Sequence, residues 1–190
     1  KALSRVVGVK KNVLNRYWDN FDTPRPEMYI NDCETAEATD RKPNQLFRDL
    51  RSACESGWDF SSRWLRDSQD LSTIHASEIL PIDLNCLLYN LETTLAKANR
   101  IAGNTGKRRQ YDSKANIRKN LILEYLWNSE KGFFMDYDFV KKEQKDVYSL
   151  AAMFPLFFNI ATSEQAEKVA EVIKRDFIKA GGVISTTLTT

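Results

Sequence analysis

The sequence has little of the histidine and cysteine on which many catalytic and metal sites depend. Its single histidine, His75, lies between two apolar residues with no carboxylate at ligand spacing, so we assign it no functional role. A Ser-His or Cys-His couple would have to use this one residue. The three cysteines, Cys33, Cys54 and Cys86, contain no CxxC pair. They indicate neither a zinc site nor a disulfide framework, and each is predicted to be a small buried residue.

Charge of one sign and long apolar runs are also missing. The 28 Lys and Arg residues are interleaved with 26 Asp and Glu residues, which argues against nucleic acid or an anionic membrane as a partner. The longest apolar run, near residues 150–158, is too short for a membrane span, and no signal peptide is visible. With 42% hydrophobic residues among 190, the chain can bury about 70% of its unfolded surface and form a core.

The N-terminal part is predicted to be a short β-hairpin. Two β-prone runs within Arg5–Trp18 flank a polar turn at Lys10–Asn12, and Gly8 disfavours a helix there. The prolines at positions 24 and 26 then form a rigid entry to the first helix.

The rest of the chain is predicted to be mainly helical, with a short extended stretch over residues 127–138. Apolar residues recur at helical spacing in six segments that form three antiparallel pairs. The segments are Met28–Ala38; Leu46–Cys54, closed by Gly57; Ile82–Ile101, with an apolar stripe of leucines; Tyr111–Leu126; Val147–Ala161, kinked at Pro155; and Ser163–Ala180, with Ser163 as N-cap and Gly181 as C-cap. Consecutive pairs of unequal length indicate an α-solenoid or, better, an α/α toroid.

The loop from Ser56 to Trp64 places one carboxylate, Asp59, between Trp58 and Phe60. Burial against aromatic rings raises the pKa of a carboxyl group, which a general acid working near neutral pH requires. The same rings could cover the apolar faces of a sugar. The alternative, about equally supported by residue types alone, is that the aromatics are core anchors and Asp59 caps the next segment.

A second cluster is the Arg25-Pro26-Glu27 segment, where prolines flank the arginine. A stiff frame that holds a guanidinium and a carboxylate suits a polyhydroxylated ligand. Taken alone, an ion pair that opens a helix is the better interpretation. Two weaker candidates are the Asp136–Asp138 segment, which we interpret as a hydrogen-bond network within a loop, and Asp83, which could face a cavity.

Several segments together resemble the trehalases of glycoside hydrolase family 37. The resemblance rests on DTPRPEMY, on RDLRSACESGWDFSSRW and on PIDLN, with VLNRYWD, DYD and a closing GG in the same order, so that it covers the whole chain. It implies an (α/α)6 toroid of helical hairpins that hydrolyses α,α-trehalose to two glucose molecules with inversion and without a metal or cofactor. It further implies Asp59 as the general acid, with Arg25, Pro26, Glu27 and Gly57 binding substrate.

An inverting glycosidase also needs a second carboxylate to activate water. The glycine-rich segment that carries this base in the family has no counterpart here, so we expect the base to lie outside the chain. Residues 1–190 are accordingly predicted to be a single segment, an incomplete portion of one toroid catalytic domain, inactive without the rest of the polypeptide. The family occurs in bacterial periplasm and cytoplasm, and the sequence does not choose between them.

The sequence is compatible with two alternatives. One is another inverting α-glucosidase of the toroid type. The other is a non-catalytic helical scaffold with an exposed aromatic groove that docks a protein partner.

Overall fold

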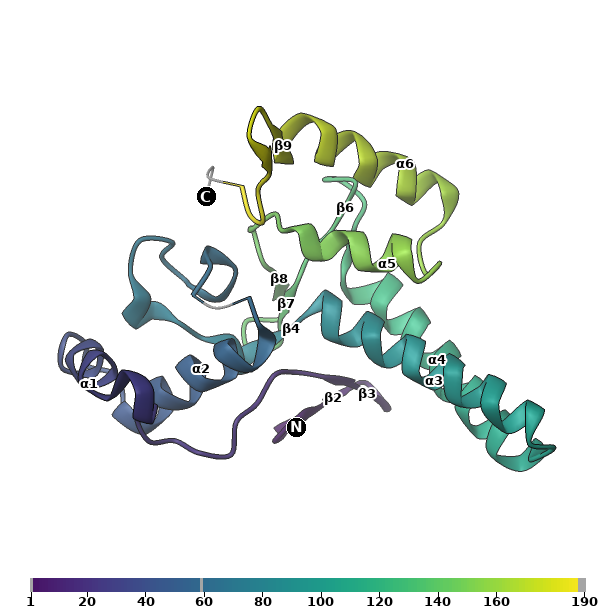
Figure 1. Ribbon diagram of the computed structural model, residues 1–190, viewed down its shortest axis with the longest axis horizontal. Helices are drawn as coiled ribbons and strands as arrows, with labels where there is room; N and C mark the ends of the chain where they lie inside the picture. Colours follow the sequence, from purple (N-terminus) through teal and green to yellow (C-terminus); the bar gives the residue numbers. More distant parts are fainter. Residues whose placement is uncertain (1, 59, 188–190) are drawn as a thin grey trace.

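The computed structural model describes residues 2–58 and 60–187, and the predicted acid Asp59 therefore lies outside the described residues. The described chain is mainly helical, as predicted. Its α-helices are α1 (Tyr29–Glu37), α2 (Pro43–Ser56), α3 (Ile82–Ile101), α4 (Thr105–Tyr125), α5 (Phe154–Phe157) and α6 (Ser163–Val172). They follow one another as three pairs. In Figure 1 the α1–α2 pair and the antiparallel α3–α4 pair lie at opposite ends of the molecule, with α5 and α6 above.

Short elements connect the helices. Single turns of 3-10 helix cover Pro26–Met28, Ser62–Trp64, Leu71–Thr73, Ala76–Glu78 and Leu150–Met153. The strands are β1 (Ala2–Leu3), β2 (Val6–Val9), β3 (Asn12–Asn15), β4 (Ile79–Leu80), β5 (Trp127–Asn128), β6 (Phe133–Phe134), β7 (Tyr137–Asp138), β8 (Glu143–Gln144), β9 (Ile178–Lys179) and β10 (Gly182–Val183). The β4-β7-β8 sheet lies at the centre and joins the segment before α3 to the segment after α4.

The predicted N-terminal hairpin is confirmed. Strands β2 and β3 pair antiparallel with Val9 opposite Asn12, which leaves a two-residue turn at Lys10 and Lys11. Lys10 has a φ of 53°, the left-handed conformation that such a tight turn requires. The buried valines of β2 pack, together with Leu14, on Leu80 and Leu121. The hairpin is thus fixed to α4 and to the central sheet.

In the first helix pair, the start and the end of α2 follow the sequence signals. Pro43 is the first residue of α2, where the missing N–H costs no helical hydrogen bond. Gly57 ends the helix with a φ of 70°, which confirms the predicted C-cap. The predicted stripe of α2 is buried from Leu46 to Ala53.

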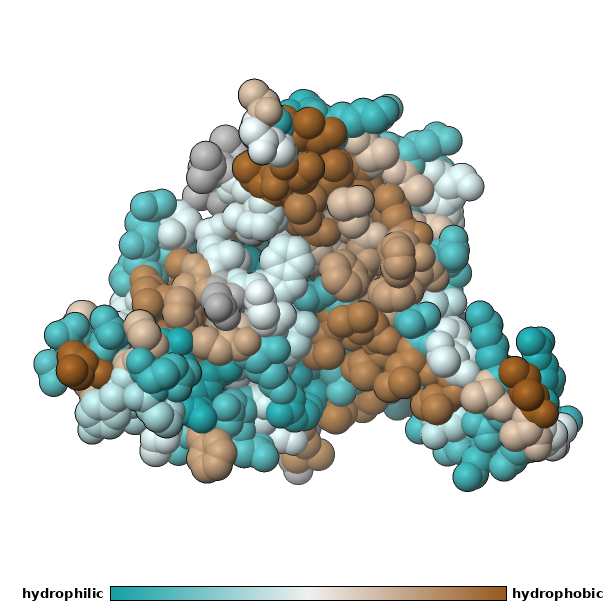
Figure 2. Space-filling model, viewed as in Figure 1, coloured by the Kyte–Doolittle hydropathy of each residue, from teal (hydrophilic) through white to brown (hydrophobic). Residues whose placement is uncertain are grey.

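The predicted stripe of α3 is only partly correct. Leu87 and Leu91 are exposed, whereas Asp83 and Asn85 near the start of the helix are buried. Figure 2 shows that hydrophobic side chains gather in several places on this face of the molecule. Of the two leucines, Leu87 lines an apolar groove of about 690 Å³, together with Met153, Phe154, Leu156, Phe157 and Phe158. The buried polar residues are tolerated because each is hydrogen-bonded: Asp83 accepts from Arg63, and the side-chain amide of Asn85 donates to the Asn15 and Pro81 carbonyls.

Two predicted boundaries in the third pair are wrong. The N-cap of α6 is Thr162 and not Ser163, because Thr162 and Gln165 form a reciprocal capping box. The helix does not continue to Ala180 with Gly181 as its C-cap. Instead it widens into a π turn over Ile173–Phe177, and the β9–β10 hairpin follows. The turn brings Phe177 into the core, where its ring stacks on Phe133 with 6.0 Å between centroids.

The predicted helix over Val147–Ala161 is also shorter in the structure. It consists of a 3-10 turn over Leu150–Met153 and the single turn α5, with Pro155 inside the first turn of α5. No helix of the described residues has the length and apolar character needed to cross a membrane.

Candidate active site

The loop after α2 carries the predicted site and begins at Gly57. This glycine is exposed and adopts the left-handed conformation, and a Cβ added to it would meet no described atom within 4 Å. Its role in the fold is therefore to turn the chain out of α2. The next residue, Trp58, is half-buried and packs against two of the core clusters.

Arg25, a predicted substrate-binding residue, is held in a buried ion pair. Its Nε and Nη2 donate to the two carboxylate oxygens of Asp32 on α1, at 3.0 and 2.6 Å, and its Nη1 donates to Cys54 Sγ at 3.1 Å. The hydrogen bonds from Arg25 to Asp32 raise the pKa of the guanidinium. Three of the five N–H groups of Arg25 are thus used within the fold.

Pro26 and Glu27 follow directly in the 3-10 helix that leads into α1. Both are exposed, and Pro26 opens the helix while Glu27 supplies its first-turn carboxylate. The partner that fixes Arg25 is Asp32 rather than Glu27. An ion pair does form at the start of this helix, but its carboxylate is Asp32, five residues after the Glu27 that the sequence suggested.

The structure brings the two predicted loops together through an aromatic ring. The guanidinium of Arg25 lies over the ring of Phe60, 4.7 Å from its centroid. Phe60 belongs to the loop after α2, and its neighbour in sequence is Asp59. The segment at residues 25–27 and the loop at residues 57–64 are therefore in contact, although they are separated by the whole of the first helix pair.

The arginine of the loop after α2, Arg63, is fully buried and binds two carboxylates. Its Nε and Nη2 donate to Asp136 at 2.5 and 2.8 Å, and Nη2 also donates to Asp83 at 2.7 Å. Burial alone would raise the pKa of Asp83, but the Arg63 guanidinium outweighs burial and lowers this pKa below its ordinary value. The hydroxyl of Tyr17 donates to Asp83 at 3.1 Å. We call these four residues the Arg63 cluster.

The Arg63 cluster unites four segments that are far apart in the sequence: the end of the hairpin, the loop after α2, the start of α3 and the stretch before β7. Asp83 does not face a cavity, contrary to expectation, because it is buried against Arg63. Asp136 forms the predicted loop-stabilising network. Sequence reasoning missed the pairing of these carboxylates with Arg63. The sequence did contain a signal for this pairing: Arg63, Asp83 and Asp136 each lie in one of the short motifs SGWDFSSRW, PIDLN and DYD.

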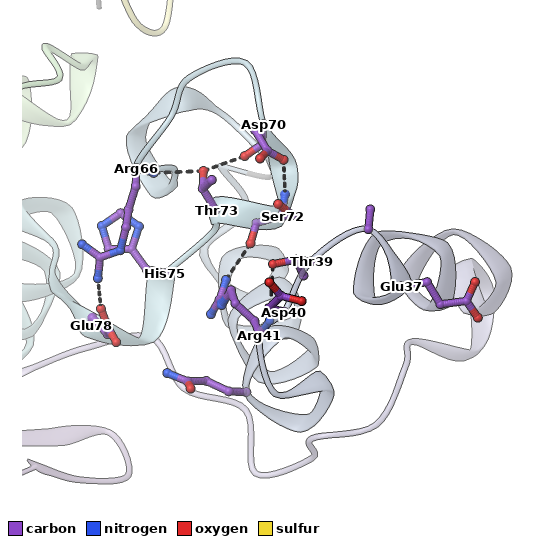
Figure 3. A pocket seen from close by; sticks show the side chains of 12 residues that line it. Glu37, Thr39, Asp40, Arg41, Arg66, Asp70, Ser72, Thr73, His75 and Glu78 are labelled. Atoms are coloured by element: carbon purple, nitrogen blue, oxygen red, sulfur yellow. Dashed lines mark hydrogen bonds and ion pairs between the residues drawn. The ribbon is translucent and has the colours of Figure 1, made fainter.

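A separate polar cavity of about 570 Å³ lies between the α1–α2 corner and residues 66–78 (Figure 3). Arg66 forms an ion pair with Glu78 beside it, and Arg41 donates to the Ser72 carbonyl at 2.9 Å. The residues that line this polar cavity are Glu37, Ala38, Thr39, Asp40, Arg41, Gln45, Arg66, Asp70, Ser72, Thr73, His75 and Glu78. The described residues of the predicted site do not line this cavity.

His75 forms part of the wall of that cavity and is almost fully buried. Burial, together with the charges of Lys145 and Arg66, lowers its pKa to about 3. The imidazole is therefore neutral at pH 7, and its Nε2 lies 3.1 Å from Lys145 Nζ. Burial likewise lowers the pKa of Lys145, to about 8. In the part of the chain that the structure describes, no group of three His, Cys, Asp or Glu side chains is arranged to hold a metal ion.

Comparison with protein families gives a match along almost the entire chain. The family model described as Trehalase matches residues 1–189. The chain belongs to the trehalase family. The periplasmic trehalase of Salmonella paratyphi C is 47% identical to it over 178 residues, which are 93% of this chain and 31% of that protein. The putative periplasmic trehalase of Salmonella typhi has the same identity and coverage. The chain thus spans about a third of the length of these relatives.

Solved structures support the fold of this trehalase-family chain. The neutral trehalase Nth1 from Saccharomyces cerevisiae aligns with a TM-score of 0.72 and 22% identity, over 92% of this chain and 36% of that chain. A GH63 mannosylglycerate hydrolase from Thermus thermophilus aligns with a TM-score of 0.53 and 22% identity, over 65% of this chain and 31% of its own. The mainly α-helical fold, part of a helical toroid, is confirmed by these likenesses and by the helix pairs.

Proposed function

We propose that this chain is part of a trehalase that hydrolyses α,α-trehalose to two glucose molecules with inversion. The observation that carries the proposal is the match of the trehalase family model to residues 1–189. Asp59 is the general acid, and the catalytic base is supplied by the rest of the polypeptide. Arg25, Pro26, Glu27 and Gly57 bind the sugar, and neither a metal nor a cofactor takes part.

The surroundings of Asp59 in the sequence suit an acid. Its neighbours Trp58 and Phe60 are each covered by a guanidinium, from Arg63 and Arg25 respectively. These contacts fix the two rings that flank Asp59 in the sequence, and burial against aromatic rings raises the pKa of a carboxyl group. The exposed carboxylate of Glu27 is available to accept hydrogen bonds from glucose hydroxyls.

In the proposed reaction, the carboxyl of Asp59 gives its proton to the oxygen that joins the two glucose units as the bond to the anomeric carbon breaks. A water molecule attacks that carbon from the opposite face, and the external base accepts the proton of the water. An inverting enzyme holds its two carboxyl groups about 6.5–9.5 Å apart to leave room for this water. The 190 residues alone therefore give no turnover.

Glucose release from trehalose by the full-length protein tests the proposal. Asp59→Asn removes the proton donor and should lower kcat by about 100-fold or more. Asp112→Asn is the matched control, since Asp112 lies on the exposed face of α4 and pairs only loosely with Arg108. The control should keep activity within about twofold. Full activity of Asp59→Asn, or the absence of trehalose hydrolysis by the unsubstituted protein, would refute the proposal.

The two alternatives predict other outcomes of the same assay. Another inverting α-glucosidase of the toroid type would cleave maltose in preference to trehalose. A non-catalytic scaffold would cleave neither sugar and would bind a partner through the aromatic groove at α5. The names of the Salmonella relatives favour the periplasm as the compartment, which cell fractionation tests.

A further inference from the structure

Arg63 has no chemical role in the proposed reaction, yet its guanidinium donates hydrogen bonds to two buried carboxylates. Its side chain is fully buried, and its planar guanidinium lies between the carboxylates of Asp83 and Asp136. Asp136 in turn accepts the backbone N–H of Ile82 at 2.9 Å. The hydroxyl of Tyr17 completes the set by donating to Asp83. Every partner of the arginine is thus itself held by a second group.

Stability alone does not account for this arrangement. Two carboxylates and one guanidinium leave a net negative charge in the interior, and removing such charges from water costs several kcal/mol per ion. Apolar residues of similar volume would often stabilise a core equally well or better. A cluster of this kind is better explained by the one conformation that it imposes on the loop after α2.

Arg63 is placed to fix the loop at Trp58. Its guanidinium lies 5.0 Å from the ring of Trp58 and 4.5 Å from the ring of Trp64. Trp64 is fully buried and forms an edge-to-face pair with Tyr17. Trp58 is the residue directly before Asp59. The arginine therefore connects the rigid core beneath the loop to the tryptophan that precedes the acid.

We propose that Arg63 is a positioning residue, which holds Trp58 and thereby sets where the following carboxyl group delivers its proton. The proposal rests on the proposed function. The planar fork of an arginine binds two carboxylates and a ring face at once, whereas lysine offers a single compact charge. Arg63→Lys keeps the positive charge and removes the fork.

Two substrates separate positioning of the acid from general damage to the fold. When trehalose is cleaved, the leaving group is glucose, and its bridging oxygen must take a proton from the acid. α-Glucosyl fluoride instead releases fluoride, a good leaving group that has little need of a proton. In the full-length protein, Arg63→Lys should lower kcat for trehalose by about 100-fold, the loss typical of a displacement near 1 Å. The same variant should lower kcat for α-glucosyl fluoride by less than about 10-fold. The KM for trehalose should change by less than about threefold.

Arg118→Lys is the matched control. Arg118 is also buried and donates in a fork to Glu92, at 3.0 and 2.9 Å, but this pair joins α4 to α3. Its substitution should leave the ratio of the two kcat values unchanged. If Arg63→Lys is insoluble, Asp136→Asn replaces it, because this variant keeps an oxygen for Ile82 N–H and leaves the buried charges balanced.

The outcomes are distinct. A selective loss on trehalose in Arg63→Lys, or in Asp136→Asn where that is the variant used, supports the positioning role. An equal loss on both substrates, or no loss, overturns it while the proposed function stands. If the unsubstituted protein cleaves neither substrate, the proposed function fails, and the positioning role fails with it.

Discussion

The guanidinium of Arg25 lies over the ring of Phe60, 4.7 Å from its centroid. Because Asp32 fixes the orientation of that guanidinium from α1, the position of the Phe60 ring depends on an ion pair in another helix. The loop after α2 is therefore held from two sides, by Arg25 at Phe60 and by Arg63 at Trp58. Both contacts involve arginines that are buried and paired with carboxylates.

The ion pair between Arg25 and Asp32 should be important for stability. Asp32→Asn leaves the buried Arg25 guanidinium without a charged partner, so we expect a loss of about 3–5 kcal/mol in the free energy of unfolding. Urea denaturation followed by circular dichroism measures it. Asp22→Asn is the control, because Asp22 pairs with Arg48 at the surface, and it should lose less than about 1 kcal/mol. Equal losses would show that the burial of the first pair is unimportant.

The core around β6 should be sensitive to truncation. Phe133 is fully buried and contacts the rings of Tyr148 and Phe177. Phe133→Ala should therefore destabilise the protein by about 3–5 kcal/mol through lost contacts and a cavity. Phe21→Ala removes an exposed ring that lies over Arg51 and should cost about 1 kcal/mol or less. Thermal unfolding of the two variants side by side tests the difference.

The start of α6 distinguishes the observed cap from the predicted one. The Thr162 hydroxyl accepts the N–H of Gln165 at 3.2 Å, and Gln165 Oε1 accepts the N–H of Thr162 at 3.0 Å. Thr162→Ala should cost about 1 kcal/mol of stability, whereas Ser163→Ala should change it by a few tenths. A larger loss of stability in Ser163→Ala than in Thr162→Ala would support Ser163 as the N-cap and contradict the capping box. Chemical denaturation resolves a difference of this size.

The buried His75 should make stability fall with acid. Its pKa is about 3 in the folded protein and about 6.5 in an unfolded chain, so between these values only the unfolded state binds the proton. The stability contribution is present above pH 6.5 and is lost as the pH falls toward 3. From pH 6.5 to 4.5 the loss should be roughly 2 kcal/mol. His75→Gln should flatten this part of the pH profile, and an unchanged profile would contradict the assignment.

Local signals in the sequence were sufficient for several elements. The hairpin at residues 6–15 follows from β-prone residues around a lysine turn, and the end of α2 follows from Gly57, whose left-handed φ costs a glycine no strain. The order of the helix pairs follows from apolar periodicity and short loops. Each of these features depends on residues close together in the chain.

Boundaries in the last pair were not predictable in this way. The choice between Thr162 and Ser163 as N-cap depends on which hydroxyl reaches the N–H of Gln165, and both residue types are good caps. The π turn that ends near Phe177 accompanies the burial of its ring against Phe133, a residue more than 40 positions earlier. Helical periodicity contains no information about that contact.

The sequence by itself determined the family, the helical character and the motif that contains Asp59, because these depend on residue identity and local spacing. Only the tertiary structure decided what the charged residues around the motif do. Arg25 pairs with Asp32 rather than Glu27, and Arg63 joins Asp83 to Asp136 across 53 positions of sequence. A buried charge is stable only beside its opposite, and the folded chain, not the order of residues, sets which opposite lies within reach.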